Sequence, residues 1–189
     1  MNTWSPKSFL VSASLACLVF AATLWSSCSK DDGIVDPCQN KVCQNGGICK
    51  SGKCDCADGY EGDDCGYTWN GAFEGQWRAT YTDSAGSLPF TTQCDLKKDP
   101  DAAVFRWNRF IQTTGMGMYW DDVRCEITDR VNFTFRPGQI SPSGFFPTYR
   151  ILAGGGKRNE AQTLIEGFVR LQNVQTGSIV RYELFVERQ

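Results

Sequence analysis

The chain has 189 residues, with 19 Lys and Arg against 21 Asp and Glu, no histidine and a net charge of −2. This near balance gives no clustered basic footprint, so we expect no nucleic-acid partner. Without histidine the chain can build no Ser-His-Asp triad, no histidine-ligated zinc site and no His-ligated haem.

Residues 1–27 have the composition of an export signal. Lys7 provides a positive start, residues 9–25 form an apolar stretch interrupted only by Ser and Thr, and the small residues Ser26 and Ser27 follow. The apolar stretch is short for a membrane span. We therefore predict a cleaved signal peptide over residues 1–27.

The residues around Cys28 resemble a lipoprotein signal, although Trp25 stands where that family usually has Leu. Residues 29–32, Ser-Lys-Asp-Asp, resemble the export signal of Bacteroidetes-type surface lipoproteins. The resemblance implies a lipidated Cys28 and an acylated tether over 28–36. It also implies anchoring in the outer membrane through N-terminal acyl chains, with exposure at the cell surface. The alternative is an ordinary solvated, charged tether.

Six cysteines lie between Cys38 and Cys65, in a stretch with almost nothing apolar to bury. A module this small needs disulfides in place of a hydrophobic core, and disulfides imply an oxidising compartment. The spacing alone leaves the connectivity open.

The same stretch resembles an EGF-like domain, which we expect over residues 37–66. Three features carry the resemblance: Asn-Gly-Gly at 45–47, the Cys54-x-Cys56 pair, and Gly-Tyr-x-Gly at 59–62. The resemblance implies three disulfides, which are Cys38–Cys49, Cys43–Cys54 and Cys56–Cys65.

We expect no metal and no cofactor in this module. Calcium-binding members of the EGF-like family carry an acidic cluster just before the first cysteine, whereas this chain has Asp36 alone. One carboxylate is far from the roughly 6–8 oxygen ligands that calcium takes. A cysteine zinc site is the alternative, which the absence of histidine makes less favourable. We therefore predict that the module is a structural spacer.

Residues 67–189 are richer in aromatic and β-branched residues, and their length suits one domain. Alternation predicts strands over 77–82, 123–128, 131–136, 164–171 and 179–186, with less regular runs at 103–112 and 147–152. Turn residues separate these runs at 84–86, 99–101, 137–138, 154–156 and 176–177. We expect Gly154-Gly155-Gly156 to form a flexible hairpin tip. The pattern predicts an all-β fold, an antiparallel barrel with a β-sandwich as the alternative.

Gly75-Gln76-Trp77 resembles the Gly-x-Trp motif of lipocalins and related calycins. That family's second signature is missing. The resemblance implies an up-and-down barrel closed at one end by Trp77, with a basic residue of the last strand, Arg181 or Arg188, near the indole. The order of lipoprotein signal, EGF-like domain and barrel also resembles a group of Bacteroidetes lipoproteins.

Two cysteines lie in this second domain. Of ten cysteines, Cys17 falls in the signal peptide, Cys28 is the lipidation candidate and six belong to the EGF-like module. The remaining two, Cys94 and Cys125, are expected to pair.

No catalytic constellation is visible, so we predict no enzyme activity. Asp121 and Asp122 are neighbours, and neighbours on a strand point to opposite faces, so they fit a turn or an edge strand.

The favoured function is a surface lipoprotein whose EGF-like spacer presents a barrel for interaction or adhesion. The alternative is a lipocalin-like protein that binds a glycan or a small apolar ligand, and a carbohydrate-active enzyme is less favoured. The 12 Phe and 6 Trp favour a filled barrel interior. Asp83-Ser84-Ala85 resembles a bacterial O-glycosylation triplet, with chance as the alternative.

Overall fold

The computed structural model describes residues 36–84, 89–112, 118–144 and 147–189. The predicted signal peptide, Cys28, the tether as far as residue 35 and Ala85 lie outside the described residues. Within the described ranges the regular elements are strands, apart from the 3-10 helix η1 (Trp69–Ala72). None of the helical segments described is long and apolar enough to cross a membrane. The all-β prediction is confirmed.

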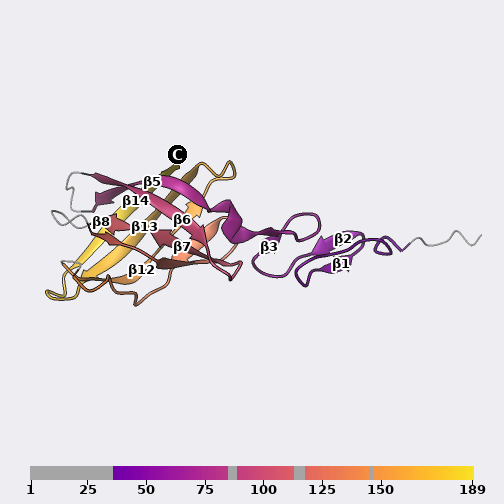
Figure 1. The fold of residues 1–189 in the computed structure, drawn as a ribbon, viewed down its shortest axis with the longest axis horizontal. Coiled ribbons are helices and arrows are strands. Elements are labelled where there is room, and N and C mark those ends of the chain that lie inside the picture. Colours follow the sequence, from indigo (N-terminus) through magenta and orange to yellow (C-terminus); the bar gives the residue numbers. More distant parts are fainter. Residues whose placement is uncertain (1–35, 85–88, 113–117, 145–146) are drawn as a thin grey trace, which may run out of the picture.

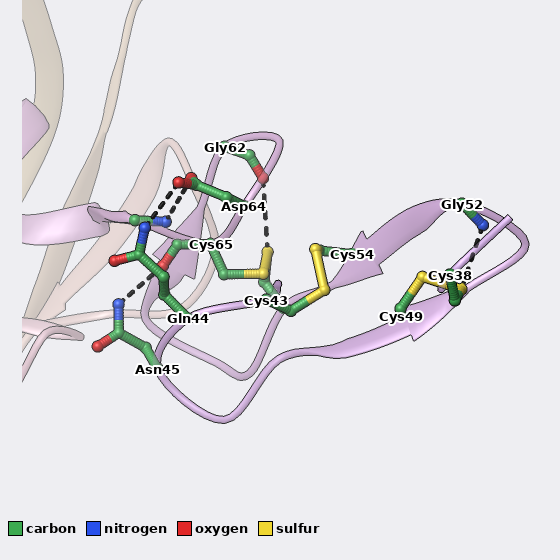
Figure 2. Close-up of a disulfide and its surroundings, with 12 residues drawn as sticks. Cys38, Cys43, Gln44, Asn45, Cys49, Gly52, Cys54, Gly62, Asp64 and Cys65 are labelled. Atoms are coloured by element: carbon green, nitrogen blue, oxygen red, sulfur yellow. Dashed lines mark hydrogen bonds between the residues drawn. A yellow bond between two sulfur atoms is a disulfide. The ribbon is translucent and has the colours of Figure 1, made fainter. Parts of the chain in front are cut away.

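The cysteine-rich module holds four short strands, which are β1 (Ile48–Lys50), β2 (Lys53–Asp55), β3 (Tyr60–Glu61) and β4 (Tyr67–Thr68). β1 pairs with β2, and β3 pairs with β4. The three disulfides are those implied by the EGF-like resemblance, Cys38–Cys49, Cys43–Cys54 and Cys56–Cys65 (Figure 2). Since β4 lies beyond residue 66, the module's second sheet includes the first residues after the expected boundary.

The rest of the chain forms a closed antiparallel barrel. Its strands are β5 (Gly75–Asp83), β6 (Phe90–Lys98), β7 (Val104–Asn108), β10 (Val123–Ile127), β11 (Asn132–Phe135), β12 (Tyr149–Arg158), β13 (Leu164–Asn173) and β14 (Ile179–Arg188). They pair in chain order and β14 closes on β5, so the barrel is confirmed over the sandwich. A small hairpin of β8 (Ile111–Gln112) and β9 (Tyr119–Trp120) lies between β7 and β10 in sequence. Figure 1 shows the cysteine-rich module extending from one end of this barrel.

Alternation along each strand directs apolar side chains inward. On β5, Trp77, Ala79 and Tyr81 are fully buried whereas Gln76 and Arg78 are exposed. The barrel's interior is rich in packed aromatic rings, which include Phe73, Trp77, Tyr81, Phe105, Trp107, Phe110, Phe133 and Phe135. Apart from Trp77, each of these rings has a neighbouring aromatic ring with the two centroids 4.8–6.4 Å apart. The large number of aromatic residues noted in the sequence thus supplies the barrel core.

The expectation of a hairpin tip at residues 154–156 is wrong, because these glycines lie in the middle of β12. All three pair with β13, and Gly155 and Gly156 also pair with β11. A Cβ at Gly154 would come within 3.0 Å of the Phe135 ring and 2.8 Å of the Val169 backbone. Glycine is needed here because neighbouring strands and rings approach closely, and no turn is formed. β6 was also missed by alternation, since its inward residues include Thr92.

The expected Cys94–Cys125 disulfide does not form, and both cysteines are buried free thiols. Cys94 lies on β6 and Cys125 on β10, with β7 between them. Two strand spacings amount to about 9.5 Å, more than the ~7 Å between Cα atoms that a disulfide spans. The two cysteines were expected to pair only because the other eight had other roles, and that argument carries no information about their distance in the fold.

Candidate functional site

Trp77 is buried near the start of β5, at the barrel end from which the module extends. Its Nε1 donates to the Phe73 carbonyl at 2.9 Å. The guanidinium of Arg188 lies over the indole with Cζ 4.8 Å from the ring centroid. Gly75 has a φ of +142°, a backbone conformation that favours glycine. Of the two expected arginines, Arg188 therefore lies near the indole, and Arg181 stacks on Phe168 instead.

Arg188 also ties the last strand to the segment that enters the barrel. Its Nη2 donates to the carbonyls of Ala72 at 3.2 Å and Glu74 at 2.8 Å. These bonds satisfy the last carbonyl of η1 and one in the link between η1 and β5, so the cation–π contact and the hydrogen bonds stabilise the same end of the barrel.

A second arginine at this end, Arg158 of β12, is buried, with 4% of its surface exposed. Its Cζ lies 5.3 Å from the Phe73 ring centroid, and its Nη2 donates to the Arg130 carbonyl at 2.9 Å. Burial lowers the pKa of the Arg158 guanidinium from its ordinary value. The side chain anchors the β10–β11 turn to the barrel end. Sequence reasoning missed it, because nothing local separates Arg158 from exposed arginines.

Asn70 of η1 joins the module to the barrel. It is 1% exposed, and its Nδ2 lies 2.9 Å from the carbonyl oxygens of Asp99, Asp101 and Val104. Its backbone N–H donates to the Ala102 carbonyl at 3.1 Å. One buried side chain thus gathers the β6–β7 turn around the linker.

Two further contacts reach from the module itself. A Cβ at Gly59 would lie 3.0 Å from the Cβ of Ala102, so the module's backbone lies directly against the β6–β7 turn. Glu61 and Arg130 form an ion pair at 3.6 Å. The module therefore contacts the barrel end directly, in addition to being connected to it by the chain.

A cleft of about 780 Å³ opens between the module and the barrel end. Tyr67 and Thr68 of β4, Glu61 of β3, and Lys98, Arg130 and Gln162 of the barrel all contribute to its walls. Part of its floor is glycine backbone at Gly62, Gly66 and Gly71. Its size is that of an ordinary ligand site, and domain junctions are frequent places for such sites.

A second hollow of about 430 Å³ lies on the outer wall of the barrel, between Phe168 and Phe185. Arg181 covers the Phe168 ring with its Cζ 3.9 Å from the centroid. Phe185 remains 43% exposed. Phe185 is therefore an accessible aromatic side chain outside the cleft.

Acidic residues singled out in the sequence have structural contacts. Asp121 accepts a hydrogen bond from the Arg109 N–H at 2.6 Å, and Asp122 pairs with Arg106 at 3.1 Å. Of the Asp83-Ser84-Ala85 triplet, Ser84 follows β5 and its N–H donates to the Arg181 carbonyl. Among the described residues no group of three His, Cys, Asp or Glu side chains is arranged to hold a metal ion.

Comparison with known families supports the first half of this architecture. Residues 38–65 match the EGF-like domain family. No curated protein matches the chain. The chain therefore carries an EGF-like domain, closed by three disulfides and followed by an eight-stranded antiparallel barrel.

Proposed function

We propose that this protein is a non-catalytic surface lipoprotein in which the EGF-like domain and the barrel form one binding head. The observation that carries the proposal is the pairing of a filled barrel with a firmly joined EGF-like domain. Because aromatic side chains occupy the described part of the barrel interior, we place the partner on the outer surface and at the domain junction. Asn70 and the Glu61–Arg130 pair hold the two domains in a fixed relation there.

The location rests on the sequence around Cys28, which supports N-terminal acylation and export to the outer face of the outer membrane. In this arrangement the EGF-like domain separates the barrel from the lipid surface. Disulfides suit it to that place, because they keep a small domain folded outside the cytosol.

The barrel is proposed to be calycin-like. The arrangement of Gly75, Trp77 and Arg188 at the closed end supports this likeness. The related function, capture of a small apolar ligand inside the barrel, is less favoured because Phe105, Phe133 and neighbouring rings fill that interior.

The proposal is tested on cells that display the protein. Wild-type cells should be labelled by an antibody to the barrel, and should adhere to glycans or secreted proteins that cells lacking the gene do not hold. Cys28→Ser should release the protein from the membrane fraction and abolish adhesion. Membrane retention of Cys28→Ser without any acyl mass on the wild type would contradict the anchor. Equal adhesion with and without the gene would contradict the binding role.

A further inference from the structure

The cleft between the EGF-like domain and the barrel end has the features of a built ligand site. Its wall carries Tyr67, which is 71% exposed. A Cβ at Gly62 would lie 2.7 Å from Cδ2 of Tyr67, so the tyrosine ring packs against the glycine backbone. One side of the ring is supported in this way while much of its surface stays open to the cleft. Such a ring offers an apolar face with a polar tip.

Polar groups with free hydrogen-bonding capacity surround this ring. The hydroxyls of Tyr67 and Thr68 and the side-chain amide of Gln162 have no hydrogen-bond partner within the described part of the chain. Together they offer both donors and acceptors. Such a set suits a ligand whose own groups donate and accept.

The segments that carry these groups are fixed. Gln162 has a φ of +58°, and its backbone N–H donates to the Asn159 carbonyl at 3.1 Å. The Asn159 side chain in turn accepts from the N–H groups of Thr163 and Leu164. On the facing turn, Arg158 holds the Arg130 carbonyl. A site whose backbone is already ordered loses less entropy on binding.

Each of the two cations that line the cleft already has a carboxylate partner. Arg130 pairs with Glu61 inside the cleft at 3.6 Å, and Lys98 pairs at 3.0 Å with Glu74, which lies outside the cleft lining. An anionic ligand would meet Glu61, and a cationic ligand would meet Arg130 and Lys98, so neither net charge is favoured. A hydroxyl group, in contrast, can accept from a cation and donate to a carboxylate at once.

We infer that this cleft binds a neutral oligosaccharide, with Tyr67 against the C–H face of one sugar ring and Arg130, Glu61 and Gln162 bonded to its hydroxyls. A sugar combines an apolar face with many hydroxyls, which is what the ring and the paired charges complement. The inference rests on the proposed binding function and adds the ligand class and the site. The EGF-like domain then contributes half of the site, beyond its role as a spacer.

The test uses the full chain purified in detergent and an array of neutral, acidic and basic glycans. It includes the N-acetylglucosamine trimer, its deacetylated cationic counterpart, maltotriose, cellotriose and trigalacturonic acid. We expect binding to at least one neutral glycan, and its affinity should change little with salt, since a neutral ligand gains nothing from long-range attraction.

Three variants locate the site by titration calorimetry with the neutral glycan that binds. Tyr67→Ala should weaken binding about tenfold, as for a central aromatic contact. Arg130→Gln should weaken it about three- to tenfold. Gln162→Gly removes the amide at a backbone conformation that glycine adopts freely, and should weaken it about threefold. Phe185→Ala on the outer wall is the matched control and should leave the affinity unchanged.

Each contrary result has a distinct meaning. Absence of binding across the neutral glycans overturns the inference but leaves the proposed function standing if cells still adhere to secreted proteins. Preference for trigalacturonic acid or the cationic trimer overturns the assigned ligand class. Binding that responds to Phe185→Ala and not to Tyr67→Ala overturns the site. Intact circular dichroism of Tyr67→Ala and Arg130→Gln, both exposed side chains, separates these results from unfolding.

Discussion

Gly156 of β12 lies directly opposite Phe133 of β11 in the barrel wall. A Cβ at Gly156 would come within 2.9 Å of the Phe133 ring and 2.7 Å of the Glu166 carbonyl oxygen. The ring therefore occupies space that only a glycine on the neighbouring strand leaves open. This relation explains why a glycine run, ordinarily a sign of a turn, is found within a long strand.

The first prediction concerns this contact. Gly156→Ala should lower the free energy of unfolding by about 1–3 kcal/mol, because an added methyl group overpacks the core. Urea denaturation of the full chain measures the loss. In a Phe133→Leu background the same substitution should cost less, since the smaller side chain leaves room. Equal losses in both backgrounds would show that Phe133 is not the limiting contact.

The second prediction concerns the contacts of Arg188 at the barrel end next to the EGF-like domain. Arg188→Ala removes the guanidinium over Trp77 and two hydrogen bonds to backbone carbonyls. We expect a loss of about 1–2 kcal/mol in unfolding free energy. The unfolding free energy of Arg188→Lys should lie between those of the wild type and Arg188→Ala, because lysine keeps the charge but lacks the planar guanidinium group. Arg170→Ala on the exposed face of β13 is the control. If Arg188→Ala lowers the unfolding free energy no more than Arg170→Ala does, Arg188 does not stabilise this end of the barrel.

The third prediction concerns the two buried thiols. In native, unreduced protein Cys94 and Cys125 should react slowly with an alkylating agent, and both should react once the chain is denatured. Peptide mass spectrometry identifies the labelled residues. The six cysteines of the EGF-like domain, locked in disulfides, serve as the internal control and should stay unlabelled without a reductant. A disulfide-linked peptide pair containing Cys94 and Cys125 would contradict the structure.

The fourth prediction follows from the protonation of the same groups. Burial raises the pKa of the Cys94 thiol to about 12 and also raises the pKa of Cys125 and of Tyr81. A thiol in the unfolded chain has a pKa of about 8.5, so the folded state keeps these protons to a higher pH than the unfolded state does. The resulting stability is complete below about pH 8.5 and declines as the pH rises toward about 12.

Urea denaturation at pH 7, 8, 9 and 10 measures this decline. The double variant Cys94→Ala, Cys125→Ala should be less stable at pH 7 but should lose less stability between pH 8 and 10. Tyr81 remains in that variant and keeps part of the slope at the upper end. An unchanged slope in the variant would mean that the thiols do not contribute.

The fifth prediction is that calcium has no specific effect on the EGF-like domain. Asp36 accepts a hydrogen bond from the Cys38 N–H at 2.9 Å, which gives this carboxylate a structural role at the start of the domain. Calorimetry of the full chain with millimolar calcium should show no saturable heat, and the melting temperature should respond equally to calcium and magnesium. A calcium-specific rise in melting temperature would reveal a site.

Local sequence determined much of the architecture. The alternation of Trp77, Ala79 and Tyr81 predicts a strand with one buried face, and the structure places β5 there. The resemblance of residues 38–65 to EGF-like domains implied three disulfides, and the structure and the family match confirm that domain and its pairing. Such features depend on neighbours in the chain, so they can be read from the chain.

Only the tertiary structure decided which distant residues meet. Whether Arg181 or Arg188 reaches Trp77 depends on the register of β14 against β5 around the closed barrel. Whether Cys94 can pair with Cys125 depends on β7 lying between their strands. The cleft likewise needs Tyr67 from one domain and Arg130 and Gln162 from two turns of the other. These outcomes follow from sheet closure and domain docking, which bring together residues with no signal of proximity in their local sequence.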